Sequence, residues 1–144
     1  MLYRRRDGKP EILLVHPGGP FWARKDEGAW SIPKGEIGAG ETPIEVARRE
    51  FTEELGAKAP EGELVSLGMV RQAGGKLVRA WAAPGDLDVA GLQSMTFELE
   101  WPPRSGKKQA FPAVDRAEWF DLDAARRKIL AGQVPFIDRL EQMV

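Results

Sequence analysis

Three glutamates near the middle of the chain have a spacing that suits metal chemistry. Glu50, Glu53 and Glu54 stand at positions i, i+3 and i+4. Because a helix turns by about 100° per residue, they would share one face if this segment is helical. Like charges at that spacing destabilise a helix, and a hard cation bound by carboxylate oxygens would remove the repulsion. The pattern is open to two interpretations, a solvated acidic surface or a platform for Mg²⁺.

Composition restricts which metal chemistry this chain can support. The 144 residues include no cysteine and a single histidine, His16. Disulfides, thiol catalysis, iron–sulfur clusters and cysteine-bound zinc are therefore excluded. The 22 acidic and 21 basic residues give a net charge of −1, which argues against a protein that coats nucleic acid or a membrane surface. A bound metal would be held mostly by oxygen, which favours Mg²⁺, Mn²⁺ or Ca²⁺.

The three glutamates belong to the segment with the strongest helix signals. Thr42 fits the N-cap, Pro43 the first helical position and Glu45 the third position of a capping box. Gly56 fits a helix stop. An apolar stripe follows helical spacing and lies about 110° around the axis from the glutamates, so we expect one face to be buried and another to present the carboxylates. The stripe consists of Ile44, Ala47, Phe51 and Leu55.

The remaining pattern mixes strands and helices. Residues 2–6 and 11–16 read as strands joined by a turn at Asp7-Gly8. Further strands are expected over 64–71, 76–82 and 96–101, with a last one ending near Trp119-Phe120. Asp121 is expected to cap a helix to about residue 131, and a short helix to follow Pro135. Without regular alternation of strand and helix, an α+β fold or a layered α/β sandwich fits best, as one domain over residues 1–144.

The segment 35–57 resembles the Nudix box of the Nudix hydrolase family. The box pattern is Gly, five residues, Glu, seven residues, then Arg-Glu-apolar-any-Glu-Glu-any-Gly-apolar. A chance match at all seven fixed positions is on the order of one in ten million per starting point. The Pro33-Lys34-Gly35 run and the segment around Trp119 extend the likeness. The Trp22 loop and the segment 100–106 are similar to a small bacterial-type branch of the family. The seven fixed positions are Gly35, Glu41, Arg49, Glu50, Glu53, Glu54 and Gly56.

The resemblance implies a fold and an activity. Nudix proteins are α/β/α sandwiches around a mixed sheet. Most hydrolyse a phosphoanhydride in a nucleoside diphosphate linked to another group, with water and a divalent cation. The implied class is a metal-dependent pyrophosphohydrolase acting on nucleoside or dinucleoside polyphosphates, with Mg²⁺ as cofactor and Mn²⁺ as the alternative. The implied compartment is the cytoplasm, since no apolar run approaches the ~18 residues of a membrane span and no signal peptide is recognisable.

The resemblance also implies a role for each box residue. Glu50, Glu53 and Glu54 are expected to bind the metal, joined by the carbonyl oxygen of Gly35. Arg49 is expected to hold one of these glutamates through a bidentate pair, and we favour Glu53. Glu41 and Gly56 have structural roles in the motif. The four residues expected to act in catalysis are Arg49, Glu50, Glu53 and Glu54.

Residues outside the box are weaker candidates for substrate contacts. Lys34 is the best placed phosphate-binding cation, and Arg79 is a further candidate. Trp22, in a polar loop, could stack on a base, whereas the phase of Trp101 places it with the apolar side chains of its strand. His16 is expected to be a capped or surface histidine. Lys76, Arg24 and Arg104 are further cations, Phe21 is another aromatic, and Glu98 and Glu100 are outside candidates for the general base.

Three questions stay open at this point. Related sequences often carry an acidic residue six positions before the late tryptophan, where this chain has Ala113. The alternative function is a nucleotide-sensing Nudix module without catalysis, although such modules commonly lose box glutamates. An isoprenoid diphosphate isomerase would need a cysteine that this chain lacks. We expect a nucleotide or dinucleotide polyphosphate as substrate, no stable nucleic acid or membrane partner, and a monomer or homodimer.

Overall fold

The fold is built around a five-stranded mixed sheet. The computed structural model describes residues 1–33, 42–60, 62, 64–72 and 74–144. The strand order is β3-β4-β1-β2-β7, and β1 with β4 is the parallel pair. No helix in these described ranges is long and apolar enough to cross a membrane. The sheet strands are β1 (Leu2–Arg6), β2 (Lys9–Pro17), β3 (Val65–Arg71), β4 (Leu77–Pro84) and β7 (Val114–Asp121).

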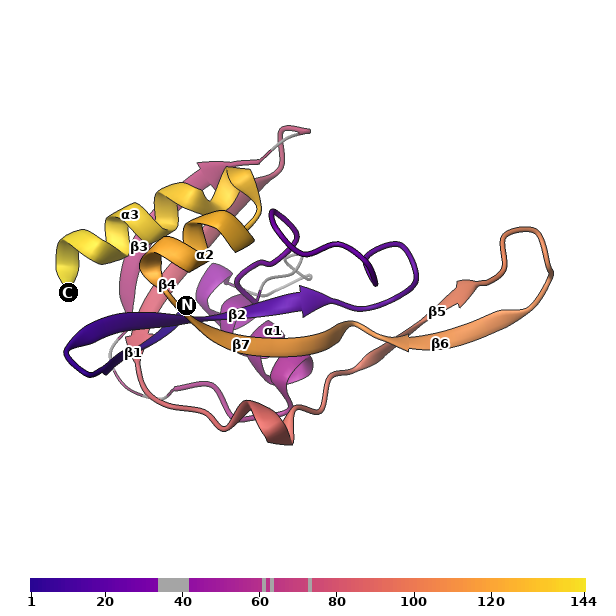
Figure 1. Cartoon of the computed structure of the whole chain (residues 1–144), viewed down its shortest axis with the longest axis horizontal. Helices are drawn as coiled ribbons and strands as arrows, with labels where there is room; N and C mark the ends of the chain where they lie inside the picture. The colour runs from indigo at the N-terminus through magenta and orange to yellow at the C-terminus, as the bar shows by residue number, and fades with distance from the viewer. Residues whose placement is uncertain (34–41, 61, 63, 73) are drawn as a thin grey trace.

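Helices cover both faces of this sheet (Figure 1). Alternation along β2 explains the layering, because Leu13 and Val15 face one way while Ile12 and Leu14 face the other. The first pair packs with α1 (Pro43–Leu55). The second pair packs with α2 (Leu122–Lys128) and α3 (Val134–Met143). The predicted α/β/α sandwich around a mixed sheet is therefore confirmed.

Local turn and cap signals match the structure closely. Asp7 and Gly8 have φ values of 51° and 76°, as a type I′ turn requires, and they join β1 to β2. Asp121 caps α2 by accepting a hydrogen bond from the Ala124 backbone, as expected. That helix ends at Lys128, earlier than predicted, because the chain turns into a short 3₁₀ segment, Ala131–Gln133, before α3 begins.

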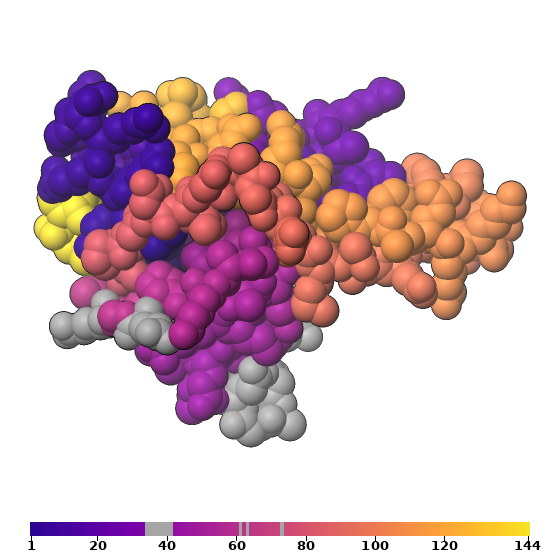
Figure 2. Space-filling view, turned by 90° about the horizontal axis from the view of Figure 1, so that it is seen from below, coloured from indigo at the N-terminus to yellow at the C-terminus, as the bar shows by residue number. Residues whose placement is uncertain are grey.

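A two-stranded ribbon extends away from the sheet, on the right in both Figure 1 and Figure 2. It consists of β5 (Thr96–Glu100) paired with β6 (Lys108–Pro112). The alternation of 96–101 suggested a strand with a core-facing side, but Phe97 is 39% exposed and packs across the ribbon on Phe111. Trp101 packs edge-on against Phe21 at 5.5 Å between ring centroids, so its half-buried state comes from a loop and not from the core.

Of the two expectations for His16, the surface position is wrong and the capped histidine is correct, since the side chain is fully buried with a partner at each ring nitrogen. Its Nδ1 lies 2.7 Å from Asp115 Oδ1, and its Nε2 lies 2.6 Å from the Lys25 carbonyl oxygen. A carbonyl only accepts, so Nε2 donates, and one further proton must lie between Nδ1 and the carboxyl group. Pairing of β2 with β7 brings Asp115 to this histidine across 99 positions of sequence, which no local motif reveals.

We expect His16→Leu to lower the free energy of unfolding by about 1–3 kcal/mol, because it leaves the Asp115 carboxyl and the Lys25 carbonyl without their partner. Urea denaturation followed by circular dichroism measures this. Asp115→Asn keeps an acceptor oxygen and should cost less. Equal stability of His16→Leu and the wild type would contradict this account.

Candidate active site

The helix α1 begins and ends at the predicted residues. Thr42 accepts a hydrogen bond from the Glu45 backbone, and the Glu45 side chain accepts one from the Thr42 backbone, which completes the capping box. Gly56 ends the helix in the left-handed conformation with φ 67°. The local sequence therefore determines where this helix starts and stops, and so which residues it presents.

Two rows of side chains on α1 decide where the carboxylates lie. Val46, Glu50 and Glu54 form one row at four-residue spacing, beside the row of Phe51 and Leu55. Val46 and Phe51 are buried, and the Glu50 side chain is only 13% exposed. Glu50 thus lies within the packed side of the helix, where the sequence analysis had expected an open acidic face apart from the apolar stripe. The solvated acidic surface is accordingly the wrong interpretation for Glu50.

Arg49 joins two of the candidate metal ligands. Its Nη1 donates to Glu50 Oε1 at 2.8 Å and to Glu53 Oε2 at 3.1 Å. The expected partner Glu53 is therefore contacted, and the same nitrogen also bridges to Glu50. Bridging by a cation offsets the repulsion between glutamates on successive turns.

The far end of α1 is fastened by the segment that precedes the ribbon. The Met95 backbone donates to the carbonyl oxygen of Glu53 at 2.8 Å. Gln93 passes so close to Gly56 that a Cβ built on this glycine would lie 2.5 Å from the Gln93 carbonyl oxygen. Gly56 is thus needed for its left-handed backbone and also for its missing side chain.

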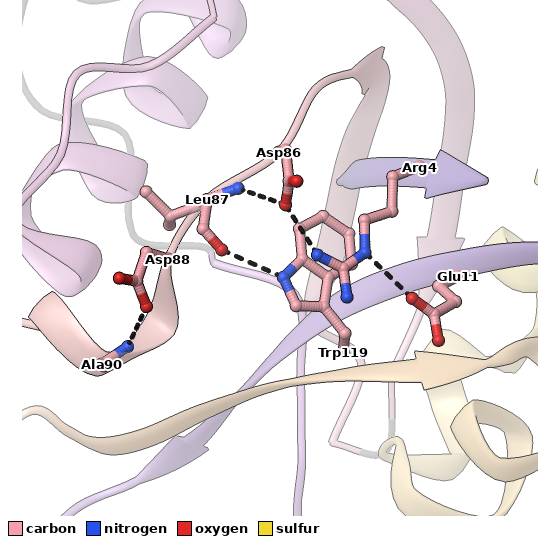
Figure 3. Close-up of polar contacts among 7 residues, drawn as sticks. All are labelled: Arg4, Glu11, Asp86, Leu87, Asp88, Ala90 and Trp119. Atoms are coloured by element: carbon pink, nitrogen blue, oxygen red, sulfur yellow. Dashed lines mark hydrogen bonds and ion pairs between the residues drawn. The ribbon is translucent and has the colours of Figure 1, made fainter. Parts of the chain in front are cut away.

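This segment is in turn anchored to the sheet by the polar cluster in Figure 3. Arg4 donates to Glu11 at 2.9 Å and to Asp86 at 2.7 Å, with its guanidinium 4.1 Å from the Trp119 ring centroid. The Trp119 indole donates to the carbonyl oxygen of Leu87 at 3.1 Å. The hydrogen bond from Arg4 lowers the pKa of the Asp86 carboxyl, so this pair stays charged at neutral pH.

A 3₁₀ turn, Val89–Gly91, carries the chain from this cluster to α1. Asp88 caps the turn by accepting from the Ala90 backbone at 2.9 Å, as Figure 3 also shows. Leu92 then packs in the same apolar cluster as Leu55. The sheet therefore fixes the end of α1 that carries Glu53 and Glu54 through a continuous set of contacts.

The other sequence candidates fall into two groups. Lys34, Gly35 and Glu41 lie outside the described residues, so their predicted roles remain predictions. Trp22 is half-buried, with Lys25 Nζ at 4.9 Å from its ring centroid. Arg79 is exposed on β4 opposite Met69.

Trp22 and the glutamates lie on different sides of the sheet. The loop of Trp22 reaches His16 through Lys25, and Gly28 donates to the Arg127 carbonyl oxygen, which places the loop on the α2 side. In Figure 2 the purple residues after β2 lie at the upper edge, away from the magenta α1. The described contacts thus do not bring Trp22 to the carboxylates, whereas Arg79 lies on the α1 side, where it lines a groove.

The described residues contain no cluster of three or more histidine, aspartate or glutamate side chains gathered as a metal site. The donor set still suits a hard cation in its chemistry. Glu50 and Glu53 offer carboxylate oxygens on successive turns within reach of one arginine nitrogen. Oxygen donors of this kind are those that Mg²⁺ takes in proteins, and Gly35, which was expected to complete the set, is outside the described ranges.

Fold and site together define an α/β/α protein with a carboxylate-bearing helix that follows a glycine-rich segment in the sequence. The chain belongs to the NUDIX domain family, whose domain matches residues 1–140. Among curated relatives, RNA pyrophosphohydrolases of Francisella tularensis (strain WY96-3418) and Francisella philomiragia are 32% and 34% identical over 56 residues. These matches cover 38% of this chain and 36% of each relative, so the aligned stretch spans about a third of their length.

Solved structures show the same fold over nearly the whole chain. The NUDIX domain of Shewanella oneidensis NrtR, complexed with ADP ribose, superposes with a TM-score of 0.65 at 16% identity, covering 99% of this chain and 82% of that one. A C. elegans Ap4A hydrolase binary complex gives 0.65 at 21% identity, covering 99% and 92%. At these identities the likeness establishes the fold alone.

The close approach of Gln93 to Gly56 can be tested by comparing this glycine with a second one of similar backbone conformation. Gly28 has a similar φ of 74° but open space around its would-be Cβ. We expect Gly28→Ala to cost about 1 kcal/mol from backbone strain, and Gly56→Ala to cost about 1–3 kcal/mol more because Gln93 must move. Chemical denaturation of both variants measures the difference. Equal losses would show that Gln93 yields freely and does not fasten α1.

Proposed function

We propose that this protein is a divalent-metal-dependent pyrophosphohydrolase that cleaves a phosphoanhydride in a nucleoside or dinucleoside polyphosphate. The observation that carries the proposal is the position of Glu50. Its carboxylate is mostly withdrawn from water and bridged by Arg49 to Glu53 on α1, and the sequence retains every fixed residue of the box. Keeping an ionised carboxylate out of water is costly, so a structural surface would seldom place it there.

Each residue of the site has a defined part in this proposal. Glu50, Glu53 and Glu54, with the Gly35 carbonyl, would hold Mg²⁺ or Mn²⁺. The bound cation supplies charge neutralisation at the diphosphate and a lower pKa for its water ligand. Arg49 orients the side chains of Glu50 and Glu53. The hydrogen bond from the Met95 backbone to the carbonyl oxygen of Glu53 holds the helix backbone at that residue.

A box glutamate is the best candidate for the general base. A base must reach the proton of the attacking water, so it must lie at the site. Glu98 and Glu100, the outside candidates, stand on the projecting ribbon, and Glu100 already accepts a hydrogen bond from the Gly106 backbone at 3.2 Å. Ala113, the position where related sequences often carry an acid, cannot serve, although its backbone pairs with Met95 beside α1.

The glutamate roles are tested by Glu53→Gln. The amide keeps the size and one acceptor but loses the charge, so we expect at least about a 100-fold loss of Mg²⁺-dependent turnover with the fold intact. Glu118→Gln is the control, since Glu118 pairs with Leu14 and therefore faces the α2 side of the sheet. Release of phosphate-containing product from a nucleotide panel, with and without EDTA, is the measurement. Full turnover by Glu53→Gln would refute the catalytic assignment.

The same panel separates hydrolysis from sensing. We infer a small nucleotide as substrate, and dinucleoside polyphosphates are favoured slightly over nucleoside triphosphates and nucleotide sugars. The names of the relatives add two substrates to include, RNA and Ap4A. A protein that binds nucleotides yet releases no product with any metal would instead be a sensing module.

A further inference from the structure

A groove of about 340 Å³ opens between α1 and the outer strands β3 and β4. Its walls are largely apolar. The apolar side chains Met69, Leu77 and Trp81 line it from the sheet, and Val46 lines it from the helix. Met69 and Leu77 are 43% and 51% exposed, which is unusual for large apolar side chains on a helix-covered face of a sheet.

One wall of the groove belongs to the same face of α1 as Glu50. Val46 and Ala47 line it, and Glu50 follows them by four and three residues, so all three side chains project from the same face of α1. A spacing of four residues is about 6 Å along a helix. The two prolines that flank the undescribed part of the box, Pro33 and Pro43, also line the groove. A ligand seated here therefore has one end within one helical turn of Glu50.

Charge and size indicate what the groove accepts. The two charged residues among those described as lining it, Lys76 and Arg79, are both basic. Apolar walls with two cations suit a flat hydrophobic group linked to an anion. The volume lies at the small end of the range for small-molecule sites, about 300–1,000 Å³, which leaves room for one nucleoside.

We propose that this groove holds the base and ribose of the nucleotide substrate, between Met69, Leu77 and Trp81, with Lys76 and Arg79 pairing with its phosphates. The proposal rests on the proposed function and adds its recognition site. The base binds the apolar side chains of the groove, and the 5′-phosphates pass between the two cations and α1 toward Glu50. Groove residues thereby determine which nucleotide is bound, while the box residues determine which bond is cut.

Steady-state kinetics of Met69→Ala and Leu77→Ala test this, with Val65→Ala as control. Val65 lies on β3 like Met69 and is equally exposed at 43%, but it does not line the groove. We expect each groove variant to raise KM for the best nucleotide about tenfold, with kcat within about twofold, and Val65→Ala to change neither. Inorganic tripolyphosphate, which lacks a base, should bind all the variants equally. Unchanged KM in the Met69→Ala/Leu77→Ala double variant, or an equal effect on tripolyphosphate, would overturn the proposal.

A binding measurement without metal tests the groove independently of the proposed hydrolysis. In EDTA, nucleoside monophosphates should quench the fluorescence of Trp81 saturably, and Trp81→Phe should abolish the signal. Isothermal titration should show about tenfold weaker binding to the Met69→Ala/Leu77→Ala double variant. Such binding without any hydrolysis would refute the proposed function and support the groove. Hydrolysis with no quenching up to the solubility limit, or with equal affinity for the double variant, would refute the groove alone.

Discussion

The site depends on a carboxylate that is kept mostly out of water. Glu50 is held by Arg49 at 2.8 Å while its neighbours Val46 and Phe51 are buried against the sheet. The helix itself opposes this arrangement, because Glu53 and Glu54 stand near its negative end and no basic residue occupies its last turn. Packing and the arginine bridge must therefore hold α1 in place against its own electrostatics.

That requirement explains contacts far from the glutamates. The capping box fixes the first turn of α1, and the Met95 and Gln93 contacts fix the last. The second set reaches the sheet through Leu87, Trp119 and Arg4, so the two ends are held by different means. The first is encoded within four residues, whereas the second needs chain segments more than 30 positions apart to meet. A helix fastened at both ends can present carboxylates at fixed spacing without help from its intrinsic stability.

Sequence reasoning succeeded where the determining interactions are local. The caps at Thr42 and Gly56, the turn at Asp7-Gly8 and the Asp121 cap each depend on a few adjacent residues, and the structure has all of them. It failed where the partner is distant. The acid that pairs with His16 lies on another strand, and Phe97 alternates like a core residue but belongs to a ribbon. The inward position of Glu50 was also missed, because a helical wheel gives angles between side chains but not which angle faces the sheet.

The same distinction separates the chemistry of this protein from its specificity. The carboxylates that would hold a cation lie within five residues of one helix, so they and the other fixed positions of the box can be recognised in one short stretch of sequence. The groove residues come from α1 and from two strands, and singly they look like ordinary strand residues. Alternation along β4 does place Leu77, Arg79 and Trp81 on one face, but it cannot show that α1 leaves that part of the face uncovered. The proposed reaction class therefore rests on a short segment of this chain, whereas the proposed substrate recognition depends on how the helix and the sheet edge meet.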